Sequence, residues 1–393
     1  MTDAELEAKI GSLKDKIKNW ADSHDLWYDA GFFDPIEHFG ERPDEDPCVL
    51  ALWYEGPLFD VFRHDSVDDL FNEFDELIDG TEFEYDIEDH ITMTFRARDE
   101  QLAEEYRKYF DFKWVCQRIG PEFAEIYTDL FEHFARHPDN LEKLWWRDFE
   151  RLLETVFGNQ GYRTELGAGS NDKGADIRLY RTGGEGEALT VVQAKRFKKH
   201  LAIELYLVAA LLGVVLDQKA EHGILVTTSR YLPSARRFAE RHPDRISLAT
   251  SEDVSKWCAE IATRLNSYSP EELDREALQA VKEGAKPGSL VGRIVHRHCG
   301  FNMVANEFCL IVKETTKAVL LKRLPEKITQ TDHYRQTGYE EPDASSESKS
   351  PCHGPQYVRA EKVNVNGELS FYGGRHQYYG FWDGKPKWFD HAD

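Results

Sequence analysis

Between about residues 141 and 263 the chain alternates strand patterns with helical patterns, and this alternation restricts the fold more than any other feature of the sequence. A helical pattern over LEKLWWRDFERLLETVFGNQGY ends at Gly161. It is followed by the strand patterns YRTEL, ADIRLY and ALTVVQAK, a helix from about 202 to 219, the strand GILVTT, the helix PSARRFAERH, the strand RISLA and a helix that begins near Ser251. Such alternation indicates an α/β layer in which at least some strands pair in parallel.

Three side chains suited to phosphate chemistry lie on two of these strands. Asp176 begins a strand directly after a turn that contains glycine. In ALTVVQAK, the two-residue period of a strand puts Gln193 and Lys195 on one face, about 6–7 Å apart. If the two strands pair, the three groups converge. A carboxylate and an amide oxygen can bind Mg²⁺, and a lysine beside them can orient or deprotonate a water and stabilise charge on a phosphate. The set predicts metal-assisted hydrolysis of phosphodiester bonds.

Each residue also has a purely structural interpretation. Asp176 alone is more often a turn or strand-capping residue than a metal ligand. Lys195 alone is typical of a solvated strand end, and Gln193 can bond a neighbouring backbone group. Glu150, on the leading helix, can simply pair with a neighbouring arginine on the helix surface.

In order and spacing, this block resembles the Mrr-type restriction endonuclease family, a branch of the PD-(D/E)xK nuclease superfamily. The pieces that carry the resemblance span about 120 residues, and they are WWRDFERLLETVFGNQGY, NDKGADIRLY, VVQAKRFKK, GILVTTSRYLPSARRFAERH and RISLA. The resemblance implies that Asp176 is the metal-binding aspartate, that Gln193 replaces the second acidic ligand, and that Lys195 is the catalytic lysine. Glu150 matches a position that can add a carboxylate to the metal site.

The resemblance also implies a fold and an activity. The expected fold is an α/β restriction-endonuclease-like core, with a central mixed sheet flanked by helices. The expected activity is that of a Mg²⁺-dependent endodeoxyribonuclease, for which Mn²⁺ can substitute, in restriction or anti-phage defence and type IV-like on modified DNA. The glutamine is typical of the Mrr branch but removes one negative charge from the site, and Ala175 is a mild departure from the usual aliphatic residue.

Two groups beside this site are predicted to bind DNA, double-stranded by preference. Basic side chains that follow the catalytic strand can contact the phosphate backbone or form a plain exposed edge, and they are Arg196, Lys198 and Lys199. Hydroxyl side chains at the end of GILVTT can bind a phosphate or brace the sheet, and they are Thr227, Thr228 and Ser229.

The distribution of charge marks a domain boundary. The net charge of −23 for 393 residues argues against a partner as anionic as DNA. However, residues 1–140 hold about 37 acidic and 13 basic side chains, whereas residues 141–270 hold about 17 and 19. The acidic charge therefore belongs to the first third of the chain, and the nuclease-like block is slightly basic.

We expect four parts along the chain. Residues 1–137 form an acidic α+β domain, a candidate sensor or an autoinhibitory cover. Residues 138–266 form the nuclease domain, residues 267–288 a linker, and residues 289–393 a small β-rich domain that binds nucleic acid or a partner. Within these parts, CVLALWYEGPLFDVFR predicts two strands of a hairpin, and about 325–355 predicts a surface loop.

The last domain holds two ambiguous patterns. Histidines and cysteines gather at HRHCG, Cys309 and Cys352-His353, but no CxxC or HxxxH pair supports a zinc site, so scattered structural residues are favoured. Aromatic residues between 371 and 389, interleaved with basic ones, suit either base stacking or the core of a β domain.

Two rival functions remain at this point. The block can be a nuclease fold that only binds nucleic acid, or a scaffold for a protein-binding sensor or adaptor. Six widely spaced cysteines, no long apolar run and no signal-peptide pattern predict a cytoplasmic protein without a membrane segment. A homodimer is an option, because cutting both strands with one site per chain calls for two copies or two events.

Overall fold

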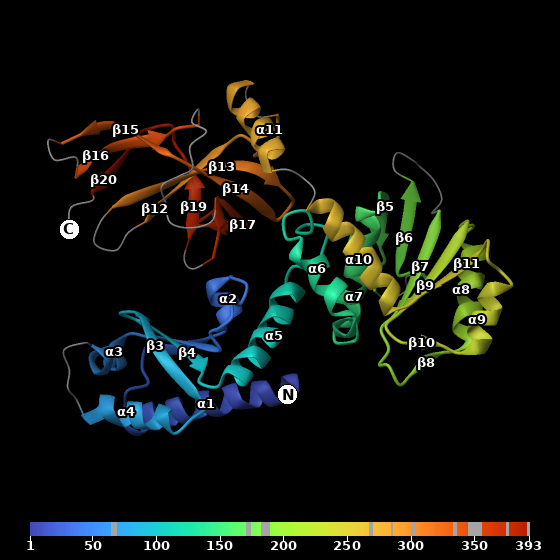
Figure 1. Cartoon of the computed structure of the whole chain (residues 1–393), viewed down its shortest axis with the longest axis horizontal. Helices are drawn as coiled ribbons and strands as arrows, with labels where there is room; N and C mark the ends of the chain where they lie inside the picture. The colour runs from blue at the N-terminus through green and yellow to red at the C-terminus, as the bar shows by residue number, and fades with distance from the viewer. Residues whose placement is uncertain are drawn as a thin grey trace. The chain divides into compact units, whose positions relative to one another are not determined.

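The computed structural model describes residues 1–63, 69–169, 174–181, 189–266, 270–283, 286–299, 304–332, 336–344, 356–374 and 377–390. By its contacts the chain divides into two compact units, of which the first holds Met1–Trp114 and the second begins at Val115 (Figure 1). Both units mix helices with sheets, as the expected fold class requires. Among the described residues, no helix is long and apolar enough to cross a membrane. The division at residues 137, 266 and 288 stays a prediction.

The first unit is a four-stranded antiparallel sheet with helices, and its strand order is β1-β2-β4-β3. Its elements are α1 (Asp3–Ser23), β1 (Ala30–Phe33), α2 (Pro35–Phe39), β2 (Leu50–Tyr54), α3 (Gly56–Phe62), α4 (Asp69–Asp79), β3 (Phe83–Asp89), β4 (Thr92–Ala97) and α5 (Glu100–Cys116). The acidic third of the chain is thus folded, as its aromatic content predicts.

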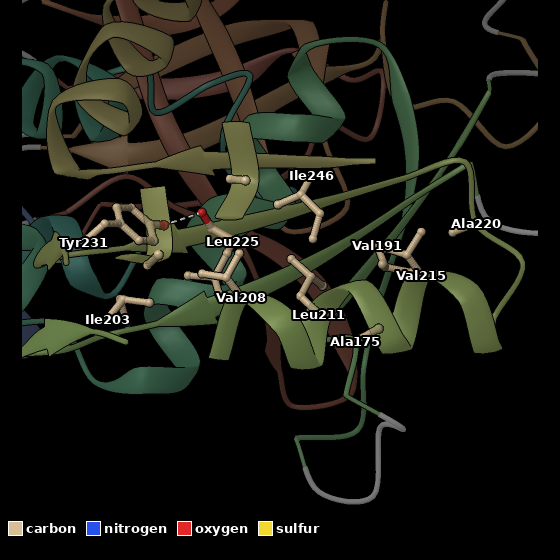
Figure 2. Close-up of a cluster of buried hydrophobic side chains, with 12 residues drawn as sticks. Ala175, Val191, Ile203, Val208, Leu211, Val215, Ala220, Leu225, Tyr231 and Ile246 are labelled. Atoms are coloured by element: carbon tan, nitrogen blue, oxygen red, sulfur yellow. Dashed lines mark hydrogen bonds between the residues drawn. The ribbon is translucent and has the colours of Figure 1, made fainter. Parts of the chain in front are cut away.

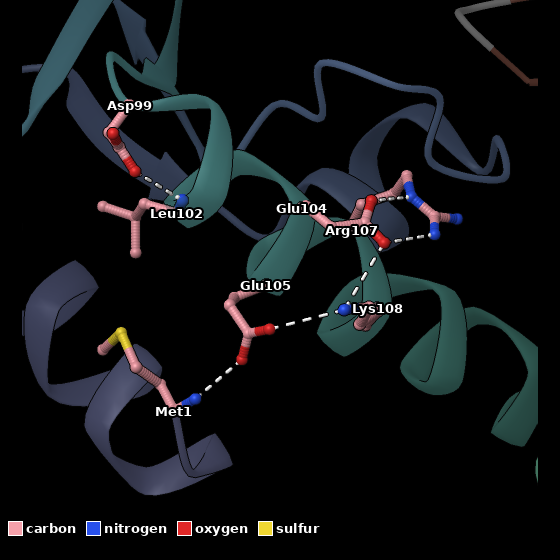
Figure 3. A network of polar contacts seen from close by, with 7 residues as sticks. All are labelled: Met1, Asp99, Leu102, Glu104, Glu105, Arg107 and Lys108. Atoms are coloured by element: carbon pink, nitrogen blue, oxygen red, sulfur yellow. Dashed lines mark hydrogen bonds and ion pairs between the residues drawn. The ribbon is translucent and has the colours of Figure 1, made fainter.

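Polar contacts fix the helix starts of this unit (Figure 3). Thr2 caps α1, because its hydroxyl accepts the N–H of Glu5 while the Glu5 carboxylate accepts the N–H of Thr2. Asp99 caps α5 by accepting the N–H of Leu102 at 2.9 Å. The Met1 amine lies 2.7 Å from the Glu105 carboxylate and so ties the start of α1 to α5.

The expected hairpin over residues 48–63 is wrong in its second half. β2 is a buried strand, but the residues after Gly56 form the helix α3. Pro57 suits the first turn of a helix, and the buried residues Leu58, Val61 and Phe62 have the three- and four-residue spacing of a helix face. That spacing indicates a helix and does not fit a strand.

Residues 115–142 belong to the second unit and join its two parts. They contain α6 (Asp129–Arg136) and the 3₁₀ helix η1 (Pro138–Glu142), and α6 packs on the last helix of the nuclease domain, α10 (Ser251–Leu265). Glu122 pairs with Arg151 of the nuclease domain and lies 3.2 Å from Lys317 of the C-terminal domain. Acidic side chains of this segment are therefore partners for basic side chains on both sides.

The part of the chain expected to be the nuclease domain is built on a five-stranded mixed sheet of order β11-β9-β7-β6-β5. Its elements before α10 are α7 (Trp146–Asn159), β5 (Tyr162–Leu166), β6 (Ile177–Arg181), β7 (Thr190–Lys195), β8 (Ala202–Ile203), α8 (Leu205–Asp217), β9 (His222–Thr227), β10 (Arg230–Tyr231), α9 (Pro233–Glu240) and β11 (Ile246–Ala249). β5-β6-β7 pair antiparallel and β7-β9-β11 pair in parallel. The mixed sheet predicted from the sequence is confirmed.

Helices cover both faces of this sheet. α7 and α10 lie on one face, while α8 and α9 lie on the other (Figure 1). The second face carries a closed apolar core in which Val191 of β7, Leu225 of β9 and Leu211 of α8 are fully buried (Figure 2). Tyr231 lies in this core, and its hydroxyl donates a hydrogen bond to the Leu225 carbonyl at 2.6 Å.

The C-terminal part is a closed β-barrel of order β12-β13-β14-β17-β18-β19, beside a three-stranded sheet of order β15-β16-β20. It follows α11 (Pro270–Glu283) and comprises β12 (Ile294–Cys299), β13 (Ala305–Glu314), β14 (Ala318–Leu324), β15 (Glu326–Thr331), β16 (Thr337–Pro342), β17 (Tyr357–Val365), β18 (Glu368–Tyr372), β19 (Tyr378–Phe381) and β20 (Lys387–Asp390). Phe371, Tyr379 and Phe389 are buried, which supports the core interpretation of the aromatic segment, while Tyr378 and Trp388 are exposed.

The surface loop expected at about 325–355 is wrong for its described first half, which forms the hairpin β15–β16. β15 is exposed along most of its length, so it lacks the apolar alternation that marks a strand in sequence. The remaining part of the expected loop lies largely outside the described residues.

One carboxylate organises the interior of the barrel. Glu307 is buried and accepts hydrogen bonds from Arg323 at 2.7 Å, from Arg297 at 2.6 and 2.9 Å, and from the Tyr379 hydroxyl at 2.8 Å. Burial alone raises the pKa of Glu307, but these partners outweigh it and hold the pKa below its ordinary value. The carboxylate is therefore charged inside the barrel.

Glu307→Leu should destabilise the barrel by about 3–5 kcal/mol, because it leaves two arginines inside without their counter-charge. Native-state hydrogen exchange of the β13 and β14 amides measures the change in opening free energy. Glu368→Leu, at an exposed position of β18, is the control and should change little. Equal protection in the two variants would contradict this role for Glu307.

Candidate catalytic site

The pairing of β6 with β7 brings Asp176 to the catalytic strand predicted from the sequence. Asp176 stands directly before β6, and its N–H donates to the Val192 carbonyl at 2.9 Å. Its carboxylate Oδ2 accepts the N–H of Ala194 at 2.7 Å. Asp176 is 8% exposed, so this contact is made in a largely dry position. The two strands pair as expected, so Asp176 lies beside the strand that carries Gln193 and Lys195.

Gln193 turns its side chain toward the turn that precedes Asp176. Its Nε2 donates to the Gly174 carbonyl at 3.4 Å. The other end of the amide, Oε1, is buried, and it has no hydrogen-bond partner within the part of the chain that the structure describes. A buried acceptor without a donor costs free energy, so this oxygen suits a cation or a water held between β7 and the turn.

Lys195 is the last residue of β7 and is half-buried. Strand alternation puts its side chain on the same face as that of Gln193. Its backbone is fixed from the neighbouring parallel strand, because the Thr227 hydroxyl donates to the Lys195 carbonyl at 2.8 Å. The strand end that carries the lysine is therefore held in register with the end of β9.

Glu150 is buried on α7 and not on the helix surface. It does form the arginine pair considered from the sequence, since Arg147 Nη1 lies 2.8 Å from its Oε2. The same guanidinium donates through Nη2 to the Gly167 carbonyl at 2.8 Å, and the Gly167 N–H donates to the Asp176 carbonyl at 2.7 Å. Arg147 thus links the Glu150 carboxylate to the chain that positions Asp176.

The donor set of this site fits a hard divalent cation. It offers carboxylate oxygens from Asp176 and the unbonded amide oxygen of Gln193, which are the ligand types that Mg²⁺ prefers. No group of three or more His, Cys, Asp or Glu side chains placed to hold a metal occurs within the described residues. Of the residues considered as zinc ligands, Cys352 and His353 lie outside the described residues.

The basic residues after β7 have different surroundings. Arg196 donates to the Glu142 carbonyl at 3.3 Å, whereas its Nε is buried and has no hydrogen-bond partner among the described residues. Lys199 is exposed and lies 2.6 Å from Asp139, which raises the pKa of the Lys199 ammonium. Lys198 is also exposed. The two lysines are the members of this group that solvent, or a phosphate, reaches most readily.

The hydroxyl group at the end of β9 braces the chain that follows β7. Thr227 and Thr228 are buried, and the Thr228 hydroxyl donates to the Phe197 carbonyl at 2.6 Å. The Ser229 hydroxyl donates to the Leu201 carbonyl. These contacts favour the bracing interpretation over phosphate binding, while the DNA-binding role of these residues stays a prediction.

The start of α7 contributes residues that the sequence did not single out. Arg147 joins the Glu150 carboxylate to the Gly167 carbonyl. Trp145 and Trp146, which precede it, are 60% and 39% exposed, with ring centroids 5.2 Å apart. A β-carbon on Gly169, beside the site, would lie 2.9 Å from the Trp146 ring. The signal available in the sequence was the pair of tryptophans at a helix start.

Comparison with known proteins identifies the domain. The restriction endonuclease family model Mrr_cat matches residues 141–258, which confirms the resemblance. The uncharacterized protein y4cE of Sinorhizobium fredii (strain NBRC 101917 / NGR234) is 24% identical over 158 residues. That match covers 40% of this chain and 40% of the relative, so the chain spans well under half of the relative's length.

Two solved structures share limited similarity with the chain. The MspJI restriction endonuclease in complex with a 27-mer oligonucleotide is 20% identical, and the match covers 42% of this chain and 36% of that one with a TM-score of 0.23. The DNA modification-dependent restriction endonuclease AspBHI is 12% identical, with 47% and 59% covered and a TM-score of 0.22.

Arg147→Ala should lower the free energy of unfolding of the nuclease domain by about 1–3 kcal/mol, because the Glu150 carboxylate stays buried without its cation. Urea denaturation measures the loss. Arg237→Ala, on the exposed side of α9, is the matched control. If both variants lose the same stability, the link between Glu150 and Gly167 is not important for the fold.

Proposed function

We propose that this protein, whose residues 141–258 match the restriction endonuclease family, is a metal-dependent endonuclease that hydrolyses phosphodiester bonds in DNA. The observation that carries the proposal is the arrangement at the β6–β7 edge. The Asp176 carboxylate accepts a hydrogen bond from the Ala194 N–H. Gln193 lies two residues before Lys195 on β7, and its buried Oε1 has no hydrogen-bond partner within the described residues. The family match supports a nuclease role for this arrangement.

The proposed cation is Mg²⁺, with Mn²⁺ as a substitute, held by Asp176 and Gln193 with Glu150 as an additional carboxylate. When bound, such a cation supplies Lewis-acid chemistry that polarises a phosphate and makes a water more nucleophilic. Restriction-endonuclease-like domains generally use divalent metals. With glutamine in place of a second carboxylate, we expect modest affinity in the absence of substrate.

The chain's own groups have separate tasks in this proposal. The Ala194 N–H holds the Asp176 carboxylate in place, so its remaining oxygen lone pairs keep a fixed direction. Lys195 brings a positive charge, and protons at Nζ, to the end of β7, where it stabilises charge that develops on the phosphate. Lys198 and Lys199, both exposed just beyond β7, contact the DNA backbone on the way to the site.

The biological setting proposed is restriction or anti-phage defence in the cytoplasm, with modified DNA as the candidate substrate. The acidic first unit is proposed as a sensor for a protein trigger or as a cover over the basic side of the nuclease. A second candidate is a domain that binds DNA without cutting it. It is favoured only by the neutral Gln193 in place of the usual second acidic ligand, since this exchange weakens a metal site.

Asp176→Asn and Lys195→Ala should each reduce cleavage by at least about 100-fold, because each removes a charge that the reaction needs at a fixed point. Asparagine keeps an oxygen for the Ala194 N–H, so the fold should persist. The measurement is conversion of supercoiled plasmid, unmodified and modified, with Mg²⁺ or Mn²⁺. Lys256→Ala, at an exposed position of α10, is the control and should retain activity.

Two outcomes separate the candidates. Equal cleavage by the wild type and both variants would reject the catalytic assignment. DNA binding by a wild type that cuts no DNA with any divalent metal would favour the silent binding domain.

Lys198→Ala and Thr228→Val should affect DNA binding differently. Loss of one phosphate contact in Lys198→Ala should reduce the slope of log K against log salt by about 0.9. Thr228→Val removes a buried hydrogen bond, so it should lower stability by about 1 kcal/mol and leave the salt slope unchanged. Fluorescence anisotropy across a salt series, with thermal unfolding in parallel, checks both. A reduced salt slope in Thr228→Val would instead assign that hydroxyl to a phosphate.

A further inference from the structure

The helix α8 is unusually apolar for one on a domain surface. Its sequence, LYLVAALLGVVLD, carries no charged side chain before Asp217. One face of α8 packs against the sheet, because Val208, Leu211 and Val215 are buried in the core beside β7 and β9 (Figure 2). Gly223 of β9 permits this close packing, since a β-carbon there would lie 2.6 Å from the Val215 side chain.

The opposite face of α8 is also apolar, but it is exposed. Tyr206 is 62% exposed, Leu216 61% and Leu205 40%. Between them, Ala210 and Gly213 are exposed, and a β-carbon added to Gly213 would meet nothing within 4 Å. A helix that is apolar on all sides is expected to be buried, and a contiguous apolar surface on a folded domain marks an interaction site.

We propose that this face of α8, defined by Leu205, Tyr206, Ala210, Gly213 and Leu216, is where two copies of the chain associate. The net charge of the chain limits which partner can bind to this face of α8. The chain carries a net charge of −23, so two copies repel each other unless they meet through a surface without charge. The five residues that define the α8 face carry no charge, while Asp217 is exposed at the end of the helix. The face therefore offers a phosphate backbone no positive counter-charge.

The spacing of the residues fits a two-fold interface. Tyr206 and Leu216 lie five residues on either side of Leu211, and the small exposed residues lie between them. In an antiparallel crossing, Tyr206 of one copy therefore meets Leu216 of the other, while Ala210 and Gly213 allow the two backbones to approach near the axis. A surface that matches itself after a two-fold rotation is the requirement of an isologous dimer.

Such a dimer has a consequence that rests on the proposed function. Each chain has one candidate site, and the two strands of duplex DNA require two cleavage events. A pair of chains joined through α8 delivers two sites in one binding event. The wild type should therefore convert supercoiled plasmid directly to the linear form, whereas a monomeric variant should accumulate nicked circles first.

The test is sedimentation velocity of the full chain from about 1 to 100 μM. The wild type should show twice the mass of one chain, and Gly213→Lys should show the mass of one chain over the same range. Lysine at 213 faces open space in the single chain and is a better helix former than glycine, so the thermal midpoint should not fall. Loss of the dimer without loss of stability is a result that misfolding cannot produce.

Leu216→Glu is the second variant and should also dissociate the dimer. Leu369→Glu is its matched control, since Leu369 is an exposed leucine (38%) on β18, away from α8. A monomeric wild type, or a dimer that persists in both α8 variants, would overturn the proposal. Because mass is measured without DNA, a wild type that dimerises but cuts nothing would reject the nuclease function and leave the α8 interface standing.

Discussion

The antiparallel pairing of β6 with β7 is the constraint on which the rest of the site depends. It brings a carboxylate that follows a turn to the backbone of a strand that carries a glutamine and a lysine. The Asp176 carboxylate accepts a hydrogen bond from the Ala194 N–H, so β7, and not the turn, fixes its position. β7 is in turn fixed by parallel pairing to β9, which sets the end of the strand at Lys195 opposite Thr227. The backbone on both sides of the site is therefore held by strand pairing within the sheet.

Acidic charge in this chain has more than one use. The sequence shows an excess of acid before residue 140, and the simplest interpretation is one acidic domain. The contacts, however, assign the acidic side chains of residues 115–142 to the second unit, because these side chains pair with arginines and lysines of that unit. Glu122 with Arg151 and Asp129 with Arg359 are examples. Acidic side chains of residues 1–114 instead pair with basic side chains of the first unit, as Asp111 does with Arg42.

The sequence was sufficient for those features that depend on local periodicity. The main strands and helices between about residues 141 and 263 and a β-rich C-terminal part were predicted, while the pairing of the Asp176 and Gln193 strands was a condition that the structure meets. It was insufficient where tertiary contacts decide. α3 was assigned as a strand because its apolar run is short, and β15 was missed because an exposed strand lacks alternation. The role of Arg147 depends on where Gly167 lies in space, which no spacing along the chain reveals.

The two faces of the nuclease sheet differ in how they are covered, and this difference follows from the position of the domain in the chain. The face under α7 and α10 is joined to α6 and η1, so the chain that enters the domain also covers it. The other face has only α8 and α9, which are supplied by the domain itself. A helix in that position must be apolar inside to bury Val191 and Leu225, but nothing in the folding of the domain requires it to be apolar outside. The exposed Tyr206 and Leu216 side chains lower the solubility of the single chain, which charged residues at these positions would not do. Association through this face removes them from water and so offsets that effect. The outer face of α8 is thus better explained by what it contacts in solution than by the stability of the single chain.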